Sequence, residues 1–173
     1  NFDRKSENSQ ISNEEIMNVL KQEYNIDETY QMDVSYEANE NAADDTKYYW
    51  EKTDANGCSN AYDALTVRID GSTNEIVTFN RFNDVAKVSE IKITEATAKE
   101  IALNVKDEFK KVTSCKKVYI KPNYFWNEEE YLEKKDEPVR LAYNVEIDNR
   151  YYVYVDVQTG DVLGGDMLKC ISD

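Results

Sequence analysis

The sequence predicts an α+β protein built from two tandem copies of one unit, each with one helix packed on a four-stranded antiparallel sheet. Two observations support this prediction. Helix signals begin near Ile11 and Ile93, which are 82 residues apart (93 − 11 = 82). Two hairpin patterns, one with Val67 and one with Val153, recur at a spacing of 86 (153 − 67 = 86). Because features of two kinds recur at nearly one spacing, an internal duplication is indicated.

The first helix signal is a capping box followed by an apolar stripe. Ser12 precedes Glu15 by three residues, so each side chain can bond to the backbone N–H of the other residue, and Ile11 can form a hydrophobic staple with Ile16. The apolar residues at helical spacing are Ile16, Val19, Leu20 and Tyr24. This pattern predicts an amphipathic helix.

The second helix signal begins at Thr94. Glu95 follows in the first turn, where the helix dipole favours a negative charge. The apolar residues expected on one face are Ala98, Ile101, Ala102, Val105 and Phe109. The spacing therefore predicts a helix that extends to Phe109.

The strand signals are alternating apolar residues between these helices and the end of each half. In the first half they are Met32, Val34 and Tyr36, then residues 48–50, then Leu65, Val67 and Ile69, and finally Ile76 and Val77. In the second half they are Val118 and Ile120, then Val139, Leu141, Tyr143, Val145 and Ile147, then Val153 and Val155, and finally Val162 and Leu163. Four antiparallel strands per half are expected.

These signals divide the chain into segments. The predicted units are 11–82 and 93–168, and residues 1–10 form a polar, flexible N-terminal stub. Such a stub is typical of a chain whose signal or lipoprotein segment has been removed, and equally of a trimmed cytosolic N-terminus. The polar stretch 83–90 has no Pro or Gly, which predicts a short ordered connection between the units.

The composition limits the partners and the chemistry of the chain. Its 35 Asp and Glu outnumber its 21 Lys and Arg, and the net charge of −14 repels nucleic acids and anionic membrane surfaces. The sequence has no histidine, which excludes histidine-based catalytic triads, imidazole metal sites and a histidine general base. No apolar run is long enough to span a bilayer. We predict no nucleic-acid partner, no membrane-spanning segment, no metal and no cofactor.

The three cysteines form no C-x-x-C pair, so a zinc or redox motif is unsupported. In an oxidising compartment Cys115 and Cys170 could close a disulfide loop, whereas the odd count argues equally for three reduced thiols. We predict no disulfide. Asp54, Asn56 and Ser59 resemble part of a calcium loop, but Cys58 stands where an EF-hand loop needs an oxygen ligand and the terminal Glu is missing, so calcium binding is not expected.

The second hairpin contains a polar turn that could be mistaken for a ligand site. Asp156, Thr159 and Gly160 lie between the two apolar runs of this hairpin. We expect Asp156 and Thr159 to bond to amides of the turn and Gly160 to adopt a positive φ, which is ordinary turn chemistry.

Two stretches of sequence resemble the YcdB/YcdC-type repeat of the wider PepSY-like group. The first contains Tyr-Trp-Glu-Lys at 49–52, Asn-Gly at 56–57 and Leu-Thr-Val-Arg-Ile-Asp at 65–70. The second contains the hairpin 153–162, which is similar to the pattern V-x-V-D-x-x-T-G-x-I of the group. The first copy departs from this pattern at Asn74, where glycine is usual.

The resemblance implies a secreted or envelope-anchored bacterial protein, with a lipid anchor on a removed N-terminal segment as one form of attachment. Relatives occur in propeptides of thermolysin-like peptidases, and the group is associated with peptidase inhibition or partner binding. No catalytic residues and no cofactor come with the resemblance.

Three aromatic residues are candidates for a protein contact. Phe125, Trp126 and Tyr131 lie in or beside the acidic stretch 127–137. Exposed aromatic residues there would suit a partner, and the alternative is a local hydrophobic cap. We therefore predict a non-catalytic protein that binds another protein, such as an extracellular peptidase. The alternatives are a structural envelope protein and a carboxylate-based hydrolase.

Overall fold

The first helix begins at the predicted capping box. In the computed structural model α1 spans Asn13–Tyr24, and Ser12 Oγ accepts a hydrogen bond from the backbone N–H of Glu15 at 3.2 Å. The Glu15 carboxylate in turn accepts from the N–H of Ser12 at 3.1 Å. The helix ends at Asn25, whose φ of 52° and ψ of 47° place it in the left-handed region. The predicted start of this helix is confirmed.

The structure describes residues 12–26, 30–32, 46–73, 75–84, 86–87, 90–127 and 137–168. The predictions that concern Ile11, Val34, Tyr36, Asn74, Tyr131, Cys170 and residues 1–10 lie outside these ranges.

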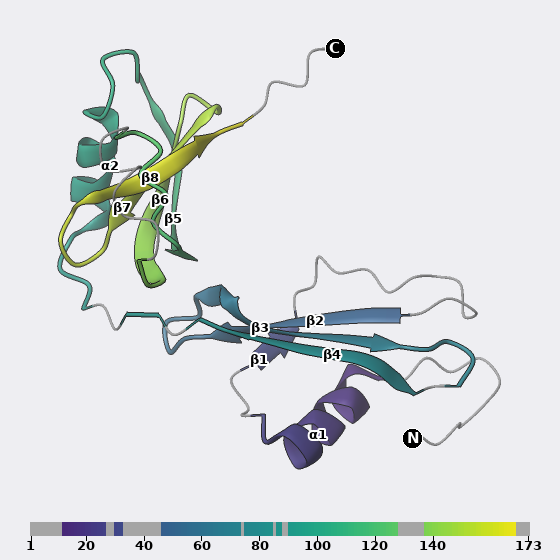
Figure 1. Ribbon diagram of the computed structural model, residues 1–173. Helices are drawn as coiled ribbons and strands as arrows, with labels where there is room; N and C mark the ends of the chain where they lie inside the picture. Colours follow the sequence, from purple (N-terminus) through teal and green to yellow (C-terminus); the bar gives the residue numbers. More distant parts are fainter. Residues whose placement is uncertain are drawn as a thin grey trace, which may run out of the picture. The chain divides into compact units, whose positions relative to one another are not determined.

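The first sheet has four antiparallel strands in the order β1-β2-β3-β4. The strands are β1 (Tyr30–Met32), β2 (Thr46–Thr53), β3 (Ser59–Ile69) and β4 (Ile76–Asn83). Figure 1 shows α1 along one face of this sheet. Ile16 and Leu20 on the helix are fully buried and pack with Trp50, Leu65 and Val67 from the strands. Burial of these side chains holds the helix to the sheet.

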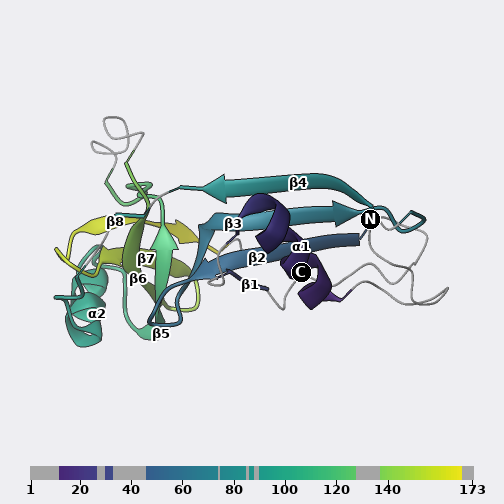
Figure 2. The same cartoon turned by 90° about the horizontal axis from the view of Figure 1, so that it is seen from below.

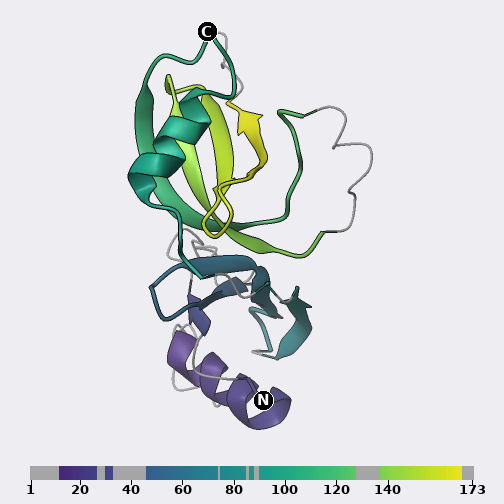
Figure 3. The same ribbon diagram turned by 90° about the vertical axis from the view of Figure 1, so that its left-hand side faces the viewer.

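The second sheet is also antiparallel, with the strand order β5-β6-β7-β8. Its elements are α2 (Glu95–Leu103), β5 (Val112–Ile120), β6 (Arg140–Ile147), β7 (Tyr151–Asp156) and β8 (Val162–Met167). Figure 3 shows α2 lying across the sheet. Ala98 and Ala102 on the helix are fully buried, and Val145, Val153 and Val155 on the strands are fully buried as well. The described residues thus form a mixed α+β protein with two helices and two antiparallel sheets.

The second helix is shorter than predicted. It begins after Thr94, whose hydroxyl accepts from the N–H of Thr97 at 3.1 Å, but it ends at Leu103, so the prediction that it extends to Phe109 is wrong. Asn104 ends the helix because its side-chain amide donates to the carbonyl of Glu100 at 2.9 Å and competes with the helical backbone. Phe109 is nevertheless buried, because it packs against Trp126 and not along the helix.

The two hairpins have the same turn. In the first, Asp70 Oδ1 accepts from the N–H groups of Ser72 and Thr73, both at 2.8 Å. In the second, Asp156 Oδ1 accepts from the N–H groups of Gln158 at 2.7 Å and Thr159 at 3.0 Å. These positions differ by 86 in each case (156 − 70 = 86). The interpretation of Asp156 and Thr159 as turn residues is confirmed, and Gly160 has the expected positive φ of 80°.

The register of the two hairpins also matches. A β-bulge interrupts the β3–β4 ladder between Arg68 and Ile69, and another interrupts the β7–β8 ladder between Tyr154 and Val155. Each bulge follows the same position in its hairpin, since 154 − 68 = 86.

The contacts between residues divide the chain into two compact units. Residues 1–83 are called here the first unit, and residues 84–173 the second unit.

The segment between β4 and α2 is hydrogen-bonded to residues that flank the second sheet. Lys87 N–H donates to the carbonyl of Val139 at 2.8 Å, and the N–H groups of Lys92 and Ile93 donate to the carbonyl of Val157 at 2.9 Å. Neither helix in the described ranges has the length and hydropathy that a membrane span requires.

Candidate binding cavity of the second unit

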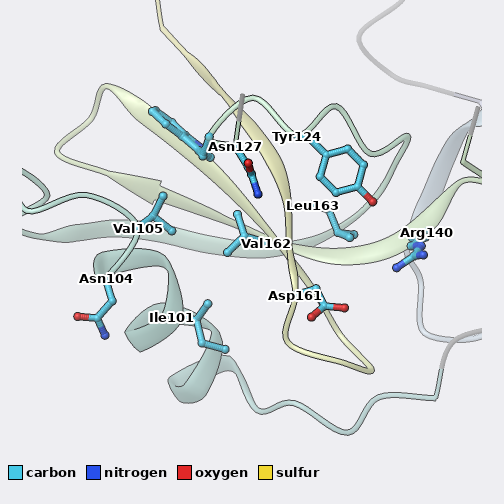
Figure 4. A pocket seen from close by; sticks show the side chains of 10 residues that line it. Ile101, Asn104, Val105, Tyr124, Asn127, Arg140, Asp161, Val162 and Leu163 are labelled. Carbon is cyan, nitrogen blue, oxygen red and sulfur yellow. The ribbon is translucent and has the colours of Figure 1, made fainter. Parts of the chain in front are cut away.

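The second unit contains a cavity of about 580 Å³. It lies between α2, the hairpin of β7 and β8, and residues 121–127, which follow β5. Figure 4 shows Ile101, Asn104 and Val105 on the helix side of this cavity. The other lining residues are Tyr124, Trp126, Asn127, Arg140, Asp161, Val162 and Leu163. The cavity therefore combines apolar side chains with the polar or charged side chains of Asn104, Asn127, Arg140 and Asp161.

The helix side of the cavity is fixed by the turn of the second hairpin. A Cβ at Gly160 would lie 3.3 Å from Cδ1 of Ile101 and 3.4 Å from Cδ1 of Ile93, so the turn lies against both isoleucines. With a φ of 80°, Gly160 also has a conformation that other residues rarely adopt. This close packing holds Asp161, the next residue, at the edge of the cavity.

The opposite side of the cavity is formed by residues 121–127, which run beside the edge strand β8. The N–H groups of Asn123 and Tyr124 both donate to the carbonyl of Leu163 at 3.0 Å. The side-chain Nδ2 of Asn123 donates to the carbonyl of Gly165 at 2.8 Å, and its Oδ1 accepts from the N–H of Gly165 at 2.9 Å. Asn123 thus replaces a neighbouring strand and occupies the outer edge of β8.

Trp126 is held in place by its indole N–H and by aromatic neighbours. Its Nε1 donates to the backbone carbonyl of Tyr152 at 2.9 Å. Its ring contacts Phe125, Phe109 and Tyr151 with centroid distances of 4.7, 5.4 and 6.0 Å. Edge-to-face contacts of this kind stabilise an aromatic cluster beyond the area that it buries. One side of Trp126 lines the cavity.

Two consecutive glycines make room for this arrangement. A Cβ at Gly164 would lie 1.8 Å from Oδ1 of Asn123, and a Cβ at Gly165 would lie 2.0 Å from Nε1 of Trp126. Real Cβ atoms do not approach other atoms so closely. The two glycines are therefore required for the contacts of Asn123 and Trp126.

Arg140 lies at the start of β6 and lines the cavity. Its Nη1 is 3.2 Å from Oδ2 of Asp156, and its Nη2 is 3.0 Å from Oε2 of Glu137. Its Nε is buried and has no hydrogen-bond partner among the described residues. A buried donor without an acceptor is uncommon in folded proteins.

Asp161 supplies a carboxylate on the same cavity. It is exposed, and one carboxylate oxygen accepts from the hydroxyl of Thr159 at 2.8 Å. In the view of Figure 4, Asp161 lies between Ile101 and Arg140. Because Arg140 is already paired with two carboxylates, the cationic charge that it brings is more than balanced, and Asp161 makes the cavity acidic.

The predicted contact residues lie at this cavity in part. Phe125 is 40% exposed, and Trp126 is half-buried and lines the cavity, while Tyr131 is outside the described residues. The sequence interpretation did not identify Arg140 or Asp161 as site residues. A signal for the site was present in Gly164 and Gly165, since two glycines inside a strand indicate a close approach by another part of the chain.

The other candidate sites from the sequence have local structural partners. Asp54 Oδ1 accepts from the N–H groups of Asn56 at 2.8 Å and Cys58 at 2.9 Å, so this oxygen closes the loop between β2 and β3. Among the residues that the structure describes, no group of three or more Cys, Asp and Glu is placed to hold a metal ion.

Comparison with known proteins gives structural similarities of low score. No protein-family model matches the chain. No curated protein matches it either. The C-terminal domain of YpeB from Bacillus megaterium is 15% identical over 96% of this chain and 70% of that chain, with a TM-score of 0.41. A protein described as a lipoprotein from Clostridium difficile 630 is 16% identical over 90% of this chain and 91% of that chain, with a TM-score of 0.31. Both TM-scores are below 0.5, so neither similarity assigns a family or a function.

Proposed function

We propose that the chain is a non-catalytic, secreted or envelope-anchored bacterial protein that binds another protein. The cavity of the second unit receives a lysine or arginine side chain from an extended segment of the partner. The observation that carries this proposal is the combination, in one cavity, of apolar side chains and an exposed carboxylate on Asp161.

The shape of a basic side chain fits these walls. Lysine and arginine have an aliphatic stem that packs on apolar surface and a charged head that stays near water. Ile101, Val105 and Val162 provide apolar surface for the stem. The head would reach Asp161, which is exposed at the hairpin turn and can accept a charge-assisted hydrogen bond.

We propose further that the two units are copies of one PepSY-like module. Their equal element order, their matching hairpin turns and their bulges at equivalent positions support this duplication. The resemblance of the sequence to PepSY-like repeats supports an extracellular peptidase as the partner and inhibition as one effect of binding. Two linked modules can bind one partner with higher avidity than either module alone.

A non-catalytic role is supported by the structural contacts of Asp156, a buried carboxylate of the second unit. Asp156 Oδ1 accepts from two amides of the turn, and its Oδ2 is paired with Arg140. A carboxylate-based hydrolase needs a pair of carboxyl groups that face a substrate. Asp156 instead fixes the hairpin and the position of Arg140.

Peptide binding tests this proposal. Extended peptides with one central lysine are titrated into the protein, with acetyl-lysine peptides as the matched control, and Trp126 fluorescence and amide chemical shifts report on the cavity. We expect the lysine peptides to bind at least about tenfold more tightly than the acetylated peptides, because acetylation removes the charge. The shifts should concentrate at Asn127 and Val162.

Two variants separate the site from the general charge. Asp161→Asn should weaken lysine binding by about tenfold, whereas Asp166→Asn, which removes the same charge from an exposed position at the other end of β8, should not. Equal binding by lysine and acetyl-lysine peptides, or equal binding by both variants, would show that this cavity does not recognise a basic side chain.

A further inference from the structure

The outer edge of β4 in the first unit is a backbone surface that no described residue covers. In the sheet order β1-β2-β3-β4, β4 is the last strand, and among the described residues it pairs with β3 alone. Figure 2 shows β4 along the outside of the sheet. Exposed edge strands are templates for pairing with another strand, and proteins usually cover or charge them.

The equivalent strand of the second unit shows which groups of β4 point outward. Gly165 lies opposite Val153, and its N–H and carbonyl both bond to Asn123, so they point away from β7. Phe79 lies opposite Val67 at the same position of its hairpin, since 165 − 86 = 79 and 153 − 86 = 67. The N–H and carbonyl of Phe79 therefore point away from β3, and by strand alternation so do those of Arg81.

The first unit cannot cover this edge in the way that the second unit does. The glycines that admit Asn123 and Trp126 are replaced at the equivalent positions of β4 by Thr78 and Phe79. A Cβ at Gly164 would approach Asn123 Oδ1 to 1.8 Å, so a residue with a side chain at this position excludes that loop. A straight strand approaches only the backbone edge and does not meet this obstacle.

The side chains of β4 favour a second copy of the same strand. The whole chain has 35 Asp and Glu in 173 residues, yet β4 (IVTFNRFN) has none and contains a single arginine. Val77 is 46% exposed and Phe82 is 54% exposed on this strand. Because each copy has a net charge of −14, two copies repel one another over most of their surface. If the two copies paired along β4, no carboxylate of one strand would lie opposite a carboxylate of the other.

We propose that the chain self-associates by antiparallel pairing of β4 with β4 of a second copy about a two-fold axis. With Asn80 opposite Asn80 of the second copy, Phe79 lies opposite Arg81 of that copy, and Thr78 lies opposite Phe82. These pairs are self-complementary and set no like charges opposite one another. The pairing adds backbone hydrogen bonds and a small buried area, so the dimer is a weak one.

The pairing is independent of the cavity of the second unit and has the opposite dependence on salt. Salt screens the repulsion between two chains that each have a net charge of −14, so it strengthens the dimer. Binding of a basic partner segment to Asp161 is weakened by salt for the same reason. Failure of one proposal is therefore distinguishable from failure of the other.

Analytical ultracentrifugation over a wide range of protein concentration and salt tests the pairing. We expect a monomer–dimer equilibrium that shifts toward dimer as salt rises. Asn80→Glu and Asn80→Lys each place like charges opposite one another, and each should weaken the dimer by about tenfold or more. Asn18→Glu adds the same charge to an exposed position of α1 and should leave the dimer as it is.

Mixing the two variants gives the sharpest outcome. An equimolar mixture of N80E and N80K chains should form a heterodimer at least as tightly as the unsubstituted chain, because opposite charges then face one another. Circular dichroism of each variant at low concentration checks that the monomer is folded. A chain that stays monomeric at every concentration and salt, or N80E chains that dimerise like the unsubstituted protein, would overturn the proposal.

Discussion

The side-chain amide of Asn123 pairs with Gly165 as a neighbouring strand would, with its Nδ2 2.8 Å from the carbonyl oxygen and its Oδ1 2.9 Å from the backbone nitrogen. This pairing closes the edge of β8 and places Trp126 against the strand. The cavity of the second unit depends on it, because Tyr124, Trp126 and Asn127 all belong to the segment that Asn123 attaches.

Gly165→Ala tests this relationship. The new Cβ would lie 2.0 Å from Nε1 of Trp126 and 2.1 Å from the carbonyl oxygen of Tyr152, and the backbone must move to admit it. We expect a loss of about 2 to 4 kcal/mol in the free energy of unfolding of the second unit, measured by denaturant titration.

Gly57→Ala, in the first unit, shows the cost of backbone strain without a steric clash. Gly57 has a φ of +75° and no atom within 4 Å of the added Cβ, so only backbone strain remains. We expect a loss of about 1 kcal/mol at that position. If the Gly165 variant is no less stable than this control, the close packing of Trp126 against β8 is contradicted.

Asp70 should make the stability of the first unit depend on acid pH. Hydrogen bonds from the Ser72 hydroxyl and from the amides of Thr73 and Ser72 lower the pKa of Asp70 from 3.8 to about 2. Because the folded pKa is the lower one, the stabilisation is complete above the unfolded pKa and is lost as pH falls from about 4 to about 2. Asp70→Asn should remove this part of the pH dependence, as measured by thermal unfolding of both proteins across that range. An identical pH profile for the two proteins would contradict the assignment.

Tyr30 should have an effect at alkaline pH. Burial, followed by the hydrogen bond to Asp63, raises the pKa of Tyr30 from 10.0 to about 12. The folded chain retains the phenolic proton that the unfolded chain loses, so stability should fall as pH rises from about 10 to about 12.

Tyr30→Phe separates the two roles of this tyrosine. The variant should lack that alkaline loss, and at neutral pH it should be less stable by about 1 to 3 kcal/mol, because the buried carboxylate of Asp63 loses a donor. Denaturation followed by tryptophan fluorescence measures both effects. A variant as stable as the parent at neutral pH would show that the hydrogen bond contributes nothing.

Cys115 should react slowly in the folded protein. Burial, and to a smaller extent the charge of Glu95, raises the pKa of its thiol from 9.0 to about 11, while Lys99 acts in the opposite direction. Since the thiolate is the nucleophile, alkylation of Cys115 should be much slower than that of the same residue in denaturant.

Thiol titration of the unfolded protein should give three thiols both with and without reductant. Fewer thiols without reductant would mean that a disulfide forms.

Local features of the fold were predictable from the sequence, and long-range contacts were not. The capping box of Ser12 and Glu15 and the turn of Asp156 involve residues within a few positions of one another, so the pattern determines the partners. The end of α2 was misjudged because Val105 and Phe109 continue the apolar spacing, although the side chain of Asn104 stops the helix. Periodicity indicates burial, but it does not say which element buries the residue.

The cavity depended on contacts between residues far apart in the chain. Trp126 donates to the carbonyl of Tyr152, and Arg140 pairs with Asp156. The partners in each pair are far apart in the sequence, so no local pattern indicates that they meet. The aromatic residues were recognisable as unusual because they adjoin an acidic stretch. Their separate roles, with Trp126 fixed by its indole N–H and Phe125 more exposed, required the structure.

Retention of a partner protein tests most directly whether the second unit binds a basic side chain in its cavity. Immobilised protein is incubated with the secreted fraction of its own organism, at low and high salt, beside Asp161→Asn and the control Asp166→Asn. We expect one partner to be retained at low salt by the parent and by D166N, D161N to retain much less, and the parent to lower peptidase activity in that fraction. Equal retention of the partner by D161N, or no retention at low salt together with unchanged peptidase activity, would contradict it.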